Sequence, residues 1–304
     1  MELEEANEII EQAQKESKEG HLDRAIELLL QIKKHSGELK VQYAWAQFSL
    51  GILYKELARF NEAEQAYKNV KREDSLEIYT RVQINLGLLF KQQGRFEEAE
   101  QAYKNVKRED SVEPYARVLF NLGILLKQQN RIEEAIQVFK NVKREDSVEA
   151  YARTQYSLGG LFKDKKQFDE AEEAYKNIKR SDSPIYYARA QINLGNLFDE
   201  QGFTKESECA YKKIKKEDSI EQYAWAQWNL YLLSGKNKYL KNIRLEYDLE
   251  TYAEAQFLLG QFATILNKKN TFWEKIPKQS EQYRKESYQI NVVANRGGPT
   301  CLNN

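Results

Sequence analysis

Two columns of polar residues recur along this chain at steps of 36 residues, and both could recognise a ligand. The first column has arginine in its middle and tryptophan at its ends: Trp45, Arg81, Arg117, Arg153, Arg189 and Trp225. The second lies four residues further on: Ser49, Asn85, Asn121, Ser157, Asn193 and Asn229. A guanidinium can bind a carboxylate or phosphate through two hydrogen bonds, and an asparagine amide offers both a donor and an acceptor to a peptide backbone. These residue types predict recognition of an extended chain.

An apolar strip runs between the two columns and could anchor such a ligand. Its members are Phe48, Ile84, Phe120, Tyr156, Ile192 and Trp228. Two other interpretations stay open. The strip could pack between neighbouring helices, and the arginines could be neutralised by acids of the chain itself, such as Asp164 and Glu200.

Residues for other chemistry are scarce. The chain has two cysteines, Cys209 and Cys301, and two histidines, His21 and His35, too few for a disulfide framework or a Cys/His zinc site. No nucleophile elbow or phosphate-binding loop is present. We therefore expect no enzyme activity, no metal and no cofactor, and we interpret both histidines as surface residues.

Overall charge narrows the choice of partner. Forty-seven basic residues balance 47 acidic ones, so the field of the whole protein gives nucleic acid no general attraction. No apolar run is long enough to span a membrane, and the expected location is the cytoplasm. The predicted partner is a protein or peptide, while its identity and the oligomeric state stay open.

The elements that position these columns are helices in a repeated unit. Only 14 Gly and 4 Pro interrupt 304 residues, and residues 62–75 and 98–111 are identical, EAEQAYKNVKREDS. Glycine recurs at the same step: Gly51, Gly87, Gly123, Gly159 and Gly195. Each unit predicts two helices, near 80–93 and 96–108 in the second full unit, with the glycine packed against a small alanine such as Ala99.

On a helical wheel, Leu86 at the centre of the buried face puts Arg81 and Ile84 on the far side, with Asn85 at its edge. A further column is interpreted as a source of internal hydrogen bonds: Gln83, Gln155, Gln191 and Gln227. The KREDS segments, such as 71–75, read as solvated loops.

The domain organisation follows from the period. We expect a degenerate repeat at 1–42, five regular repeats at 43–222, a shortened repeat at 223–251, a last repeat at 252–278, a capping helix at 279–294 and a flexible tail at 295–304. The shortening amounts to seven residues around Ser234 and Gly235, about two helical turns.

With Leu86-Gly87 in the first helix and Ala99 followed by Tyr103 in the second, the chain resembles the tetratricopeptide repeat (TPR) family, and residues 190–195 resemble its Sel-like branch. The resemblance implies a right-handed α-solenoid whose first helices line the concave side. It also implies that the asparagine column grips the main chain of a ligand. The expected function is a non-catalytic scaffold or adaptor that binds an extended peptide or protein segment. An RNA-binding helical-repeat protein and a peptide-sensing regulator are the alternatives.

Overall fold

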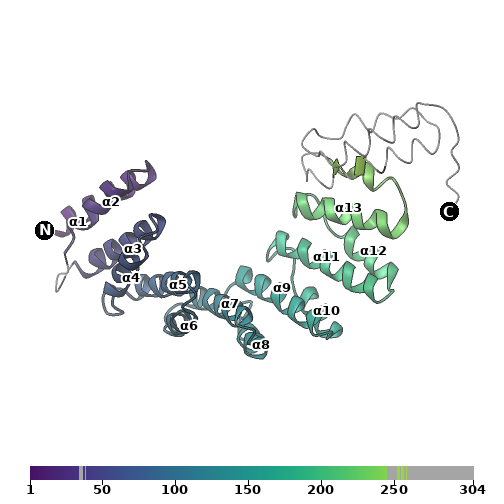
Figure 1. The fold of residues 1–304 in the computed structure, drawn as a ribbon, viewed down its shortest axis with the longest axis horizontal. Helices are drawn as coiled ribbons and strands as arrows, with labels where there is room; N and C mark the ends of the chain where they lie inside the picture. Colours follow the sequence, from purple (N-terminus) through teal and green to yellow (C-terminus); the bar gives the residue numbers. More distant parts are fainter. Residues whose placement is uncertain (34–36, 38, 245–251, 254, 257, 259–304) are drawn as a thin grey trace. The chain divides into compact units, whose positions relative to one another are not determined.

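A computed structural model describes residues 1–33, 37, 39–244, 252–253, 255–256 and 258 of the chain. Within these residues the protein forms thirteen α-helices, one short 3₁₀ helix (Leu240–Asn242) and no β-strand (Figure 1). The chain divides into two compact units, residues 1–154 and 155–304. The predicted capping helix, the tail and nearly all of the last repeat lie outside the described residues.

Long and short helices alternate along the chain. The long A helices are α3 (Lys40–Glu56), α5 (Leu76–Gln92), α7 (Val112–Gln128), α9 (Val148–Asp164) and α11 (Pro184–Glu200). The short B helices are α4 (Phe60–Asn69), α6 (Phe96–Lys104), α8 (Ile132–Lys140), α10 (Phe168–Lys176) and α12 (Thr204–Lys212). Before them come α1 (Leu3–Lys18) and α2 (Leu22–Leu29), and α13 (Ile220–Ser234) follows.

The packing of these helices confirms the predicted fold class. In the first unit α5 packs against its own B helix, α6, and also against the A helices α3 and α7 on either side (Figure 1). In the second unit α11 packs in the same way against α12 and α13. Helix pairs stacked on neighbouring pairs are the architecture of an α-solenoid, in which each pair buries the apolar face of the next.

The A helices begin earlier, and the B helices end earlier, than the sequence predicts. Ser75 precedes α5, and its hydroxyl accepts a hydrogen bond from Ile78 N at 3.4 Å, so the helix begins at residue 76 rather than 80. After α6 the carboxylate of Asp110 accepts a hydrogen bond from Lys107 N at 3.2 Å. This turn takes the place of a further helical turn, and α6 ends at Lys104 rather than 108.

An aromatic ring lies against each of the repeated glycines, a contact that the sequence analysis did not predict. A Cβ placed on Gly87 would lie 2.2 Å from Cε1 of Tyr103, and one on Gly123 would lie 2.2 Å from the same atom of Phe139. Both rings are fully buried. The glycine therefore lets helix B press its aromatic side chain against the backbone of helix A, which explains why the two residues recur together at a spacing of 16.

Buried glutamines on the A helices confirm the interpretation of the glutamine column as internal. The side-chain nitrogen of Asn105 donates to Gln83 Oε1 at 2.9 Å. Pairs with the same separation of 22 residues join Asn69 to Gln47 at 2.9 Å and Asn177 to Gln155 at 3.4 Å. Asn242 donates to Gln227 at 2.9 Å, although only 15 residues separate them. The seven residues missing from that repeat thus leave its A helix paired with the segment that follows.

One repeat in the second unit lacks half of this pair. Lys213 stands where the other repeats have asparagine, and the Oε1 atom of the buried Gln191 has no hydrogen-bond partner within the described residues. An unsatisfied buried acceptor costs about 1–3 kcal/mol.

Lys213→Asn is therefore expected to raise the free energy of unfolding by about 1 kcal/mol, because it supplies the missing donor. Denaturant unfolding of the wild type and the variant measures the change. The control is the same substitution in a Gln191→Leu background, which should gain nothing because leucine accepts no hydrogen bond. An equal gain in both backgrounds would show that the hydrogen bond is not the cause.

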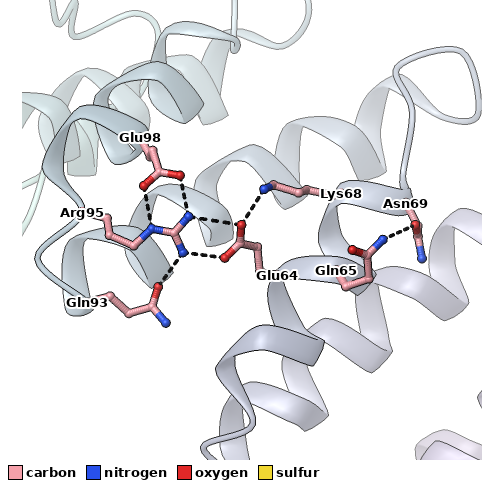
Figure 2. A network of polar contacts seen from close by, with 7 residues as sticks. All are labelled: Glu64, Gln65, Lys68, Asn69, Gln93, Arg95 and Glu98. Carbon is pink, nitrogen blue, oxygen red and sulfur yellow. Dashed lines mark hydrogen bonds and ion pairs between the residues drawn. The ribbon is translucent and has the colours of Figure 1, made fainter.

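Arginines at the turn between the A and B helices tie neighbouring repeats together. Arg95, just before α6, contacts Glu98 of α6 and Glu64 of the preceding B helix, α4, each at 2.5 Å (Figure 2). Lys68 pairs with the same Glu64 at 2.5 Å. Arg131 repeats the arrangement with Glu134 and Glu100, each at 2.6 Å. The acid shared between two B helices helps to set the register of one repeat on the next.

The KREDS segments are not simply solvated loops, contrary to the sequence-based expectation. Arg108 binds Asp146 of the following KREDS segment, with Nη2 at 2.6 Å from Oδ1. Arg72 makes the corresponding bidentate pair with Asp110. The carboxylates of both aspartates are 1% exposed. Each segment therefore links its own repeat to the next one.

These contacts predict acid sensitivity. Hydrogen bonds from Arg95 lower the pKa of Glu64, and those from Arg72 lower the pKa of Asp110. A depressed carboxyl pKa stabilises the folded state above the unfolded pKa of about 4, and that stabilisation is lost as the pH falls through the folded value. The free energy of unfolding should therefore drop as the solution is acidified below about pH 4. Glu64→Gln, which cannot ionise, should show a smaller drop; an identical pH profile for this variant would contradict the assignment.

Candidate functional site

The arginine and asparagine columns of the first unit lie on successive A helices. Arg81 and Asn85 stand on α5, Arg117 and Asn121 on α7, and Arg153 near the start of α9. All three arginines are exposed and both asparagines are half-buried. The helical wheel thus assigned the arginines correctly to a face away from the buried seam.

A pocket of about 490 Å³ brings members of both columns together. Arg81 and Asn85 from α5 line it with Arg117 from α7, and the buried Phe48 and Ile84 of the apolar strip supply its hydrophobic wall. Two carboxylates, those of Glu77 on α5 and Glu113 at the first turn of α7, also line it, together with the hydroxyls of Thr80 and Ser111. The pocket therefore combines two guanidinium groups, two carboxylates, one amide and an apolar surface.

A second pocket, of about 370 Å³, lies one repeat further along. Its arginines are Arg117 and Arg153, its asparagine is Asn121, and its apolar wall is made by Ile84 and Phe120. Every one of these residues is the residue of the first pocket displaced by 36 positions. Arg117 lines both pockets, so the two are adjacent.

The partners of the arginines bear on the alternative that acids of the chain neutralise them. Arg81 pairs with Glu77 of its own helix at 2.8 Å, and Arg117 lies 3.9 Å from Glu113. All four side chains are more than half exposed, and such pairs contribute about 0–1 kcal/mol. A ligand carboxylate can compete with glutamates held this weakly. Glu200, one of the acids suggested by the sequence, pairs with Lys163 instead, at 2.6 Å.

Arg153 contacts an aromatic ring of the apolar strip. Its guanidinium carbon lies 4.7 Å from the ring centroid of Phe120, in the geometry of a cation–π contact. This contact draws the positive charge of Arg153 over the apolar wall of the second pocket.

The apolar strip serves the core as well as the pockets. Phe48, Ile84 and Trp228 are buried, whereas Phe120, Tyr156 and Ile192 are half-buried. The aromatic members of the strip contact the aromatic residue of the following B helix. The ring centroids are 6.4 Å apart for Phe48 and Tyr67 and 6.1 Å apart for Phe120 and Phe139. The suggestion that the strip packs internally is thus correct for its inner edge, while its outer edge lines the pockets.

The asparagine column does not have one environment throughout. In the second unit Asn193 donates a hydrogen bond to the hydroxyl of Tyr175 at 3.1 Å. Asn85 and Asn121 have the same sequence separation from Tyr67 and Tyr103, but those two hydroxyls are buried without a partner in the described part of the chain. The amides of Asn85 and Asn121 are therefore not held by the tyrosines, and both line a pocket.

The remaining members of the columns lie outside these two pockets. Trp45 and Ser49 line a separate, mainly apolar pocket of about 360 Å³ against α1 and α2, and Trp45 meets Phe48 edge to face. In the second unit Trp225 is 44% exposed and Asn229 is half-buried. Arg189 lies 5.5 Å from the ring of Tyr186 on its own helix.

Sequence reasoning missed the acids at the rim of the pockets. Glu77, Glu113 and Glu149 recur at the same 36-residue step and line one or both pockets. The 36-residue spacing could have revealed them. They were overlooked because they follow directly after the KREDS segments, which were interpreted as solvated loops.

One cluster on the first unit has metal-binding residue types. Glu16, Glu19 and His21 lie close together, with His21 Nδ1 3.0 Å from Glu16 and exposed to solvent as predicted. Arg24 reaches the same Glu16 at 3.5 Å, so the cluster is accounted for by ion pairing. His35 lies outside the described residues.

Comparison with known proteins agrees with the repeat geometry. Residues 48–114 and 84–150 match one family model described as a tetratricopeptide repeat, and residues 152–183 match a second. These residues belong to the tetratricopeptide repeat family. Repeats of this family generally mediate protein–protein interaction, and TPR proteins are typically non-catalytic. The Sel-like character of residues 190–195 stays a prediction.

Two solved structures resemble this TPR protein at low sequence identity. One is a tetratricopeptide repeat protein from Parabacteroides merdae, which is 20% identical, with 95% of this chain and 99% of that chain covered and a TM-score of 0.48. The other is BtubC (BKLC) from P. vanneervenii, also 20% identical, with 69% and 87% covered and a TM-score of 0.43. No curated protein matches the chain. Among the described residues, none of the helices has the length and apolar character needed to cross a membrane.

Proposed function

We propose that this TPR protein is a non-catalytic scaffold that binds an extended, acidic segment of a partner protein across α5, α7 and the start of α9. The observation that carries the proposal is the arginine column. Arg81, Arg117 and Arg153 line two adjacent pockets, and the pairs that Arg81 and Arg117 make with Glu77 and Glu113 are exposed and weak.

The chemistry of the pockets supports a peptide rather than a small charged molecule. Each pocket places an asparagine amide beside the arginines, and an amide can bond the N–H and C=O of a passing main chain whatever its sequence. The adjoining apolar walls favour side chains of a peptide over a fully hydrated anion.

RNA is the competing ligand, because arginine and aromatic residues also suit nucleotides. The two can be separated by measuring binding of a labelled synthetic peptide of glutamate, proline and alanine, and of a single-stranded RNA oligonucleotide, at several salt concentrations. We expect the peptide to bind more tightly than the RNA, and more tightly than the same peptide with glutamine in place of glutamate.

The outcome that would overturn the proposal is the reverse order. If the RNA binds more tightly, a plot of log affinity against log salt concentration should fall with a slope of about −0.7 for each neutralised phosphate. In that case the groove binds nucleic acid instead. Equal affinity for the glutamate and glutamine peptides would remove the role assigned to the arginines.

A further inference from the structure

The two pockets on the A helices are copies of one another, and this repetition restricts the ligand. Displacement by 36 residues carries Arg81 to Arg117, Asn85 to Asn121 and Ile84 to Phe120, and it carries Arg117 to Arg153. The N-terminal turn of the following A helix is repeated as well, since Ser111 and Glu113 become Ser147 and Glu149. A ligand that crosses both pockets meets the same chemistry twice.

The distance between these copies follows from helix packing. The pockets lie on neighbouring A helices, α5 and α7, which are in direct contact. Packed helices have axes about 8–10 Å apart. Equivalent points in the two pockets are therefore separated by about 8–10 Å. A ligand must place equivalent groups at that interval on one of its faces.

A polyproline II segment meets this requirement. It advances about 3.1 Å per residue with three residues per turn, so side chains three positions apart point the same way at about 9 Å. A β-strand does not: residues two apart share a face but are only about 7 Å apart, and residues three apart face opposite ways.

The sign of the repeated ligand groups follows from which charges the fold itself needs. Glu77, Glu113 and Glu149 stand in the first turn of α5, α7 and α9, where a negative charge stabilises the positive end of the helix dipole. Arg81, Arg117 and Arg153 lie one turn further in, where the dipole gives no such reason for a cation. Arg81 and Arg117 pair with exposed glutamates of their own helices, and such weak pairs can be exchanged for a ligand carboxylate.

We infer that the bound segment is a polyproline II peptide with two acidic side chains three residues apart. One carboxylate lies between Arg81 and Arg117, and the other lies between Arg117 and Arg153. Arg117 serves both sites, whereas each of the other two arginines serves one. This inference rests on the proposed function and adds the spacing and conformation of the ligand.

The test compares isomeric peptides on the full-length protein by calorimetry or fluorescence anisotropy. All the peptides are proline-rich and otherwise neutral. Three of them carry two glutamates, placed at positions i and i+2, i and i+3, or i and i+4. A fourth peptide carries a single glutamate. We expect the three-position peptide to bind at least about tenfold more tightly than the other three, because only it fills both pockets without strain.

Arginine variants then assign the pockets. Arg117→Ala should reduce the affinity for the three-position peptide to that of the single-glutamate peptide or below it. Arg81→Ala and Arg153→Ala should each abolish the preference for three-position spacing while leaving single-glutamate binding. Lys127→Ala removes an exposed charge from the same helix α7 outside both pockets and is the matched control, expected to behave as wild type.

The outcomes separate this inference from the function on which it rests. If all two-glutamate peptides bind equally well and better than the single-glutamate peptide, the paired-site inference fails and acidic peptide binding stands. If no acidic peptide binds, both fail. If a peptide with lysines in place of its glutamates binds more tightly, the protein's own Glu77, Glu113 and Glu149 recognise the ligand, and the inference is overturned.

Discussion

Gly159→Ala is expected to lower the free energy of unfolding by about 2–3 kcal/mol, whereas Gly160→Ala, at the next position, should raise it by about 0.5–1 kcal/mol. A Cβ on Gly159 would lie 2.4 Å from Cε1 of Tyr175, whose side chain is 1% exposed and has no free space to move into. For Gly160 the nearest atom is the Tyr175 hydroxyl, at 4.0 Å. Both residues lie in helix α9, so helix propensity favours alanine equally at the two positions, by about 0.5–1 kcal/mol.

Thermal and denaturant unfolding of the two variants measure this contrast, and a third variant identifies its cause. Tyr175→Leu combined with Gly159→Ala should lose less than the sum of the two separate changes, because the shorter side chain leaves room for the methyl group. If Gly159→Ala and Gly160→Ala have the same stability, the aromatic ring does not require glycine at the repeated position.

The second large effect concerns binding. Arg117→Ala together with Arg153→Ala is expected to weaken the binding of an acidic peptide by about 2–4 kcal/mol, since hydrogen bonds to charged groups contribute more than neutral ones. Asn121→Ala should cost about 1 kcal/mol whatever the peptide sequence, because an amide bonded to the main chain reads no side chains. Melting temperature should change little in either variant, since the replaced side chains are exposed or half-buried.

Measuring affinity and melting temperature on the same samples distinguishes binding from a structural role. Lys107→Ala with Lys127→Ala removes the same net charge from exposed positions outside the pockets and controls for general electrostatics. A large loss of stability with unchanged affinity would mean that the arginines serve only the fold. In that case the proposed groove on the A helices would have to be abandoned.

The helical repeat was predictable from the sequence because every signal for it is local or strictly periodic. Leucines at helical spacing, few helix breakers and a constant 36-residue step predict paired helices without reference to any distant contact. The same periodicity identified Arg81, Arg117 and Arg153 as a column on one face. The glutamine column could be interpreted as internal because a polar side chain repeated on a buried face needs a partner.

What the sequence could not supply was the partner of each repeated residue. The sequence predicted only an alanine next to Gly87, and the packing of α6 on α5 shows that the ring of Tyr103 lies against it. Arg108 and Asp146 are 38 residues apart in segments that look like solvated loops, and stacking of the repeats makes them a pair. The helix ends were misplaced by about four residues because a capping side chain such as Ser75 outweighs propensity at the boundary.

The sequence by itself therefore determined the fold class, the repeat length and the residue types that face away from the seam. Tertiary structure alone decided that Arg117 belongs to two adjacent pockets, and that Asn193 is bonded to Tyr175 while Asn85 and Asn121 line the groove. The physical reason is that helix formation follows from residues three and four apart, whereas a pocket is defined by side chains from several helices whose separation is set only when the helices pack.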